Sequence, residues 1–178
     1  SAAAIGTGAF TSVEANRSMY VTKAPDQQAF LKMAPCDSPN GDFVYDWGDD
    51  LEVNIQGSDG SEDAFNSQLP DGQGVNTMAV TDFDHVFKIA NQGTQEIEVA
   101  IDDSDIAHPD RMNFYYGTDP SNSLEKWGNV VLGIGDTVHV GIQIDTTEMY
   151  GDTSDGVVEI IGNTGNVKVK AEATNPGH

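Results

Sequence analysis

Apolar and polar residues alternate along much of the chain with a period of two. In Thr137–Asp145 the apolar residues on one face are Val138, Val140, Ile142 and Ile144. In Gln95–Asp102 they are Ile97, Val99 and Ile101. Successive side chains of a β-strand point to opposite faces of a sheet, so this pattern predicts strands with one buried face. The 3.6-residue period of an amphipathic helix is almost absent from the chain.

Shorter strand-like segments surround these two, separated by turn-forming clusters of Gly, Asn, Asp and Pro. We expect strands at Ser18–Lys23, Phe43–Trp47, Leu51–Gln56, Met78–Val80, Val86–Ala90, Met112–Tyr116, Val157–Ile161 and Val167–Glu172. A bend is expected near Asp82–Asp84, one helical turn after Pro25 within Ala24–Ala34, and a loop at Pro35–Gly41. Roughly eight to ten strands predict an all-β fold, an antiparallel β-sandwich of jelly-roll type.

The charge of the chain restricts its partners. Its 178 residues, enough for one domain, include 29 acidic and 8 basic residues, a formal net charge of −21. Such a chain repels phosphate, so we expect no nucleic acid and no anionic membrane surface as a partner. It also repels itself at low salt, and molar salt screens that repulsion. A halophilic archaeal source is the leading explanation, and a calcium-loaded surface protein is the alternative.

The first residues, Ser1–Val13, contrast with this acidity because they are small, apolar and uncharged. The segment is shorter than the about 20 apolar residues that a membrane span needs. It also lacks the basic region of a signal peptide, so we expect that a signal peptide has already been removed. Residues 1–12 are interpreted as an extended strand that completes the sheet of a neighbouring subunit, and residues 13–178 as the sandwich domain. The alternative is a frayed N-terminus.

Four segments carry a family resemblance, in the same order along the chain: Gly6–Arg17, Val86–Ala100, Leu132–Ile144 and Gly165–Ala173. The set resembles the TasA/camelysin family of biofilm-matrix fibre subunits and is similar to archaeal bundling pilins. Residues 35–75 have no counterpart. The resemblance implies a secreted cell-surface protein, without a membrane anchor when mature, that forms a homopolymer by inserting an N-terminal donor strand into the next subunit's jelly roll.

Alternation divides the expected donor strand into two faces. The predicted self-assembly residues are Ala3, Ala4, Ile5, Gly6, Thr7, Gly8, Ala9 and Phe10. Ile5 is the large apolar group on one face, and we assign it to the acceptor's core. Phe10 breaks the parity, so a bend near Gly8–Ala9 is expected to let it bury as a second anchor.

Catalytic motifs are scarce, so the chain is predicted not to be an enzyme. The camelysin name carries a metallopeptidase label, but His85, His108, His139 and His178 have no zinc-ligand spacing and are interpreted as unrelated. No cofactor is expected, with calcium as the open possibility. Its candidate ligands are Asp102, Asp103, Asp105 and Asp110, and a second acidic cluster lies at Asp46–Asp50.

Other residues leave alternatives open. Asn16 begins the only N-glycosylation sequon, Asn16-Arg17-Ser18. The lone Cys36 is interpreted as structural. Aromatic residues that could stack on sugars, although packing explains them more simply, are Trp47, Trp127, Tyr115 and Tyr116. The leading function is therefore a filament subunit. The alternatives are a non-polymerising surface module that binds carbohydrate or an S-layer and, less favoured, a secreted metallopeptidase.

Overall fold

Ten strands build the part of the protein that the computed structural model describes, residues 18–23, 30–48, 50–54, 79–147, 160–161 and 165–174. The strands are β1 (Ser18–Lys23), β2 (Leu31–Pro35), β3 (Val44–Asp46), β4 (Leu51–Asn54), β5 (Val80–Asn91), β6 (Ile97–Asp102), β7 (Met112–Tyr116), β8 (Val130–Leu132), β9 (Thr137–Asp145) and β10 (Asn166–Ala173). Two 3₁₀-helices, η2 (Pro39–Phe43) and η4 (Pro109–Arg111), precede β3 and β7.

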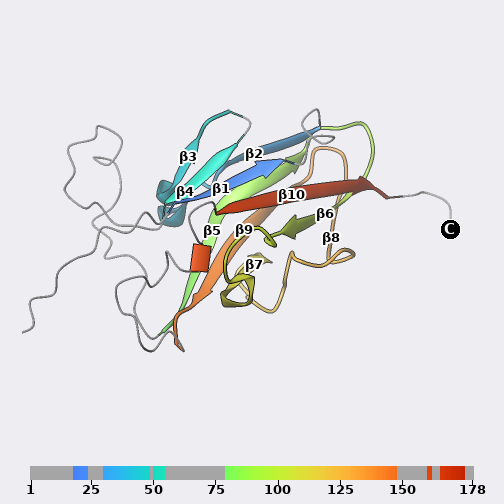
Figure 1. The fold of residues 1–178 in the computed structure, drawn as a ribbon. Helices are drawn as coiled ribbons and strands as arrows, with labels where there is room; N and C mark the ends of the chain where they lie inside the picture. Colours follow the sequence, from blue (N-terminus) through green and yellow to red (C-terminus); the bar gives the residue numbers. More distant parts are fainter. Residues whose placement is uncertain are drawn as a thin grey trace, which may run out of the picture.

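The strands form two sheets. The six-stranded sheet has the order β3-β4-β1-β10-β6-β8, and the four-stranded sheet has the order β2-β5-β9-β7. Figure 1 shows β1 in blue beside β10 in red, so the first and last described strands are neighbours. The predicted all-β sandwich is confirmed. Its jelly-roll type stays a prediction, and the boundary between residues 12 and 13 lies outside the described residues.

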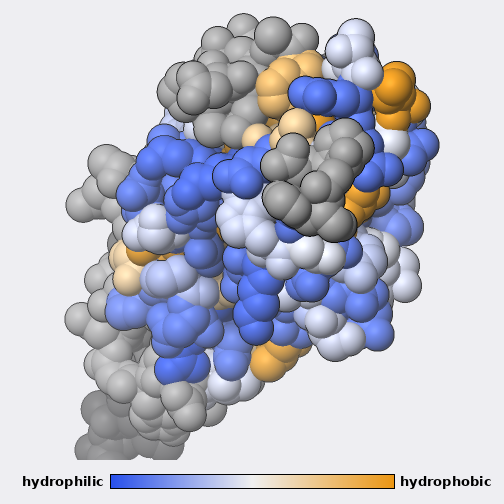
Figure 2. Space-filling model, turned by 90° about the vertical axis from the view of Figure 1, so that its right-hand side faces the viewer, coloured by the Kyte–Doolittle hydropathy of each residue, from blue (hydrophilic) through white to orange (hydrophobic). Residues whose placement is uncertain are grey.

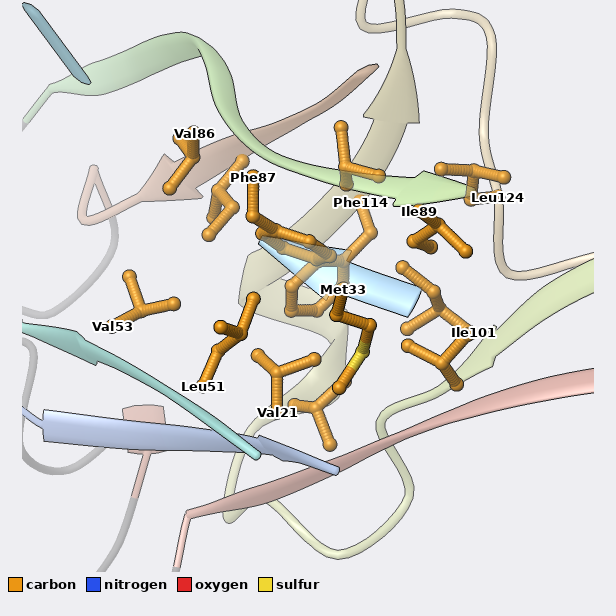
Figure 3. Close-up of a cluster of buried hydrophobic side chains, with 14 of the residues drawn as sticks. Val21, Met33, Leu51, Val53, Val86, Phe87, Ile89, Ile101, Phe114 and Leu124 are labelled. Atoms are coloured by element: carbon orange, nitrogen blue, oxygen red, sulfur yellow. The ribbon is translucent and has the colours of Figure 1, made fainter. Parts of the chain in front are cut away.

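A single apolar cluster fills the space between the sheets. Figure 3 shows side chains from both sheets meeting there. The six-stranded sheet contributes Val21, Leu51, Val53 and Ile101, and the four-stranded sheet contributes Met33, Phe87, Ile89 and Phe114. Fully burying an aliphatic or aromatic side chain of this kind contributes about 1.5–3 kcal/mol. The alternation read from the sequence is therefore the pattern that builds this core.

Four details differ from the sequence-based expectations. Leu31–Pro35 is strand β2, so the expectation is wrong at Leu31, the last residue of the expected helical turn, and at Pro35, where the loop was expected to begin; residues 24–29 lie outside the described residues. Leu31 and Met33 face the core while Lys32 is exposed. Strand β8 was not expected, because three residues are too few to show alternation. Ile160 and Ile161, which were expected to end a strand, are helical. Both side chains are buried, whereas in a strand with one exposed face one of two consecutive side chains would point to solvent.

The fourth difference concerns direction. β1 and β10 pair in parallel, with Tyr20 opposite Asn166 and Lys23 opposite Val169, whereas the other strand pairs among the described residues are antiparallel. Parallel neighbours cannot be joined by a tight hairpin. These two strands come from opposite ends of the described chain, so their connection has the length that a parallel pair requires.

Candidate functional site

The residues predicted for self-assembly, Ala3 to Phe10, and the sequon residue Asn16 lie outside the described residues, so both predictions stand as predictions. The structure does describe the sheet edges that could receive a donor strand. A sheet edge presents unpaired backbone N–H and C=O groups, and proteins usually protect such edges against pairing with other chains. The described sheets end at four strands, β3, β8, β2 and β7.

Strand β7 is covered by the chain itself. The amide of Leu124 donates to the carbonyl of Phe114 at 2.7 Å, and the amide of Tyr116 donates to the carbonyl of Asn122 at 3.0 Å. The carbonyl of Leu124 also accepts a hydrogen bond from the amide of Ile101 on β6, at 2.8 Å. The segment Asn122–Leu124 therefore ties the edge of one sheet to the other sheet.

Strand β2 is protected by a lysine and a proline. Lys23, only 8% exposed, donates from its ammonium group to the carbonyl of Leu31 at 3.2 Å. The amide of Gln92 donates to the carbonyl of Phe30, and the amide of Cys36 donates to the carbonyl of Val86, so the backbone groups of Phe30 and Cys36 face β5. Backbone groups alternate in direction along a strand, so the N–H and C=O groups of Leu31 and Met33, and the C=O of Pro35, face away from β5. Pro35 has no N–H to offer, so this edge is a poor template for a further strand.

Strand β3 is short and ends in charge. Its backbone leads out of η2, and the amide of Val44 donates to the carbonyl of Gly41. Asp46 ends the strand, and its carboxylate accepts a hydrogen bond from the amide of Gly48 at 2.7 Å in the turn to β4. A charged side chain at an edge is a common protection against association.

Strand β8 is as short as β3, but it lacks the charge, the proline and the covering segment that protect the other three edges. Its residues are all apolar, Val130, Val131 and Leu132, and they pair with β6 from Ile97 to Val99. Because Ile97, Val99 and Ile101 direct their backbone groups toward β8 and Leu124, the backbone of Val131 points away from β6. No described residue forms a backbone hydrogen bond with it on that side. The side chain of Val131 is 49% exposed.

Two further exposed apolar side chains flank β8 along the chain. Trp127 precedes the strand and is 43% exposed, and Ile134 follows it at the turn into β9 and is 66% exposed. Figure 2 shows a molecular face that is mostly hydrophilic, with hydrophobic side chains at a few separate places. On an acidic protein, an open apolar edge strand, flanked along the chain by two exposed apolar residues, indicates a surface that another chain could cover.

A row of aromatic residues crosses the outer face of the six-stranded sheet. Tyr20 on β1 and Tyr45 on β3 both lie opposite Glu52 on β4. The indole N–H of Trp47, a residue 57% exposed, donates to the carboxylate of Glu52 at 3.2 Å. Burial, the larger effect, and the charge of Glu52 raise the pKa of Tyr45. The sequence singled out Trp47 but not the two tyrosines, because only the strand register brings them together.

The calcium candidates are divided among different partners. Lys170 donates to the carboxylate of Asp102 and Lys168 to that of Asp105, whereas Asp110 lies 3.7 Å from the guanidinium of Arg111. One oxygen of Asp103 is buried with no hydrogen-bond partner, and burial raises the pKa of this carboxyl. Within the described ranges, no group of three or more His, Cys, Asp or Glu residues is arranged to hold a metal ion.

Two of the four histidines are neighbours in space, and their interpretation as unrelated to a zinc site stays a prediction. The imidazole rings of His85 and His139 have centroids 5.2 Å apart and planes tilted by 49°. The sequence could not reveal this proximity, because it depends on an irregularity in the pairing of β5 with β9. His108 lies elsewhere, at the start of η4, and His178 is outside the described residues.

That irregularity is a large β-bulge. Phe83 pairs with Ile142 and Phe87 with Val140, so the three residues between them on β5 lie opposite Gly141 alone. The bulge agrees with the bend expected near Asp82–Asp84. His85, inside it, has a φ of 53°, which is uncommon for a residue other than glycine.

Side chains hold the bulge in place through three hydrogen bonds. The carbonyls of Asp84 and His85 accept hydrogen bonds from the Asn40 amide group at 2.7 Å and from the Ser38 hydroxyl at 2.6 Å. The hydroxyl of the fully buried Tyr115 donates to the carboxylate of Asp84 at 2.7 Å. Burial and this hydrogen bond raise the pKa of Tyr115, so its hydroxyl keeps its proton. A Cβ atom at Gly141 would lie 2.4 Å from the Tyr115 ring, so the close packing requires glycine there.

The single thiol is not reactive. Cys36 is buried, and burial, as the largest effect, raises its pKa to about 11. A thiol in this range is almost fully protonated at neutral pH and is a poor nucleophile. The finding fits the structural interpretation of this residue.

Comparison with protein-family models, with curated proteins and with solved structures finds no match to this chain. Within the described residues, no helix is both long and apolar enough to span a membrane. The function is therefore inferred from three features of the structure: the sheet edges, the aromatic row and the bulge.

Proposed function

We propose that this protein is the structural subunit of an extracellular filament, a pilus or matrix fibre, which forms a homopolymer by donor-strand complementation. In this proposal residues 1–12 of one subunit pair with the free edge of β8 in the next. The mature subunit is secreted to the cell surface, is not an enzyme and needs neither a membrane nor nucleic acid. The observation that carries the proposal is the contrast between β8, which is apolar and open, and the other three edges, which are protected.

The chemistry of the two surfaces is complementary. The donor segment has no charged residue and one large aliphatic group, Ile5, and the exposed apolar residues at the acceptor edge are Trp127, Val131 and Ile134. Pairing of an extended segment with an open edge gives backbone hydrogen bonds, each worth about 0.5–1.5 kcal/mol net. Twelve extended residues span about 40 Å at about 3.3 Å per residue, which exceeds the length of β8 several times. The excess length allows residues beyond the strand to reach Ile134 or Trp127.

The test is assembly of three variants in molar salt, where the net charge of −21 is screened. Ile5→Asp places an unpaired charge in an apolar contact and is expected to abolish filaments in negative-stain micrographs. Deletion of residues 1–12 is expected to give soluble subunits. Ala2→Asp, a matched control on the face with almost no side chains, is expected to assemble. Normal filaments from both Ile5→Asp and the deletion would refute the donor-strand mechanism.

A second function is favoured by the aromatic row at Tyr20, Tyr45 and Trp47. Aromatic faces stack on sugar rings, and Glu52 offers a hydrogen-bond acceptor between the two tyrosines. The protein would then be a surface module that binds a neutral polysaccharide, since the negative charge of the chain disfavours an anionic one. Unaltered monomers that bind such a glycan, and lose binding in Trp47→Ala, would favour this function over filament formation.

A further inference from the structure

The His85–His139 pair is the arrangement in the described structure that neither the fold nor filament formation explains. His85 lies in a bulge that three neighbouring groups hold in place, and its backbone has an unfavourable positive φ. Such strain persists where surrounding structure enforces it, and bulges often redirect a side chain toward a functional position. Here the redirected side chain is an imidazole, and it lies beside a second imidazole from the adjacent strand.

From this geometry we infer that His85 and His139 bind a divalent transition-metal ion of the zinc type. A zinc–nitrogen bond is about 2.0–2.1 Å, and the centre of an imidazole ring lies about 1.1 Å beyond its nitrogen. Two imidazoles at a tetrahedral angle therefore have centroids about 5.2 Å apart. The observed separation is 5.2 Å.

The surroundings leave the two rings as the protein's ligands. The Asp84 carboxylate accepts the Tyr115 hydroxyl, and Lys88, which lies opposite His139 in the register, pairs with Asp37 at 3.2 Å. Since no third His, Cys, Asp or Glu of the described residues joins the pair, water completes the coordination. A site with two protein ligands exchanges its metal readily. It differs from the structural zinc sites of four ligands, and it revises the expectation that the protein binds no transition metal.

The site is also suited to discrimination among ions. Imidazole is a good ligand for zinc, nickel and copper, whereas calcium and magnesium prefer oxygen. The acidic surface offers many carboxylates that bind any divalent cation weakly. Excess magnesium in the buffer occupies these carboxylates and leaves the imidazole pair available, so a titration in magnesium separates the two kinds of binding.

The experiment is calorimetric titration of Zn²⁺ into the full chain near neutral pH with excess Mg²⁺ present. We expect one Zn²⁺ per subunit, and a loss of affinity of about tenfold or more in each of His139→Ala and His85→Asn. Asparagine is chosen at position 85 because it tolerates positive φ and so preserves the bulge. His108→Ala, which removes the exposed histidine that precedes η4, is the matched control and should bind as the unaltered protein does.

Thermal melts add a readout that does not depend on the calorimeter. A ligand that binds only the folded state raises the melting temperature with concentration. Zn²⁺ should therefore raise the melting temperature of the unaltered protein and of His108→Ala, and not that of the other two variants. Absence of binding by the unaltered protein, equal affinity in His139→Ala, or an equal loss in His108→Ala would each overturn the inference. None of these outcomes bears on donor-strand assembly.

Discussion

Strands β2 and β8 both end a sheet, yet their free edges differ in chemistry. β2 carries Pro35, and its outward carbonyl at Leu31 is bonded by the buried Lys23. β8 carries three apolar residues, and the outward backbone of Val131 has no backbone partner among the described residues. The protection of β2 requires a buried lysine and a residue without an N–H group, both of which are unfavourable for stability. An edge that the same protein leaves without such protection therefore indicates a surface where pairing with another chain is tolerated. The difference indicates where a second chain is expected to bind.

The largest expected effect comes from making β8 resemble β2. Val131→Lys places a cation on the open edge, and we expect filament formation to be lost while the fold is retained. The matched control is Val80→Lys, because Val80 is 51% exposed, as Val131 is 49% exposed, and lies on β5 in the other sheet. Both variants change the net charge equally. Electron microscopy and circular dichroism measure the two properties, and filaments of normal length from Val131→Lys would remove β8 as the acceptor edge.

The comparison of edges could not have been made from the sequence. The bounds of β1, β7 and β9 agree with the sequence prediction residue for residue, because local alternation alone determines them. The order of strands in a sheet depends on contacts between segments far apart in the chain. Strand β8 and the parallel pairing of β1 with β10 are of this kind, and neither was predicted.

The same limit applies to the candidate site. His85 and His139 belong to predicted strands, and the bend near Asp82–Asp84 was expected. The rings meet because three bulged residues of β5 lie opposite the single Gly141 of β9, and this register has no local signal. A histidine in a bend opposite a glycine, with Tyr115 nearby in space, becomes recognisable only once the pairing is known.

A smaller effect is expected when the protection of β2 is removed. Lys23→Met keeps the length of the side chain but leaves the Leu31 carbonyl without this donor. A hydrogen bond to a charged group contributes about 1.5–3 kcal/mol to stability. The variant also no longer buries an ammonium group, which is unfavourable, and this gain offsets part of the loss. We therefore expect the free energy of unfolding to fall by about 1 kcal/mol. Lys32→Met, at an exposed lysine of β2 itself, should change stability by less than about 0.5 kcal/mol. Equal urea midpoints for the two variants would show that Lys23 does not protect this edge.

The smallest expected effects concern two adjacent acidic residues, Asp102 and Asp103, at the end of β6, the strand with which β8 pairs. The hydrogen bond from Lys170 is the main cause that lowers the pKa of Asp102. Burial is the main cause that raises the pKa of Asp103, and the charge of Asp102 adds to it. At neutral pH, Asp102 therefore stabilises the folded state and Asp103 destabilises it. Their replacements by asparagine should have opposite signs.

We expect Asp102→Asn to lower the free energy of unfolding by about 0.5 kcal/mol, a value suited to a partly exposed ion pair. Asp103→Asn should raise it by about 1 kcal/mol or less, because the neutral amide removes the cost of burying a charged carboxylate at this position. Each variant removes one negative charge, so the change in overall charge repulsion is the same in both and does not affect the comparison.

A depressed pKa contributes stability above the unfolded-state value, near 3.9, that is lost as the pH falls further. The penalty of the raised pKa disappears as the pH falls through the folded-state value of Asp103. Urea melts from pH 7 to pH 3 should therefore show the gain of Asp103→Asn disappearing, whereas the loss in Asp102→Asn largely persists to pH 3 and fades only in stronger acid. Variants that differ from the unaltered protein in the same direction at pH 7 would contradict the assigned roles.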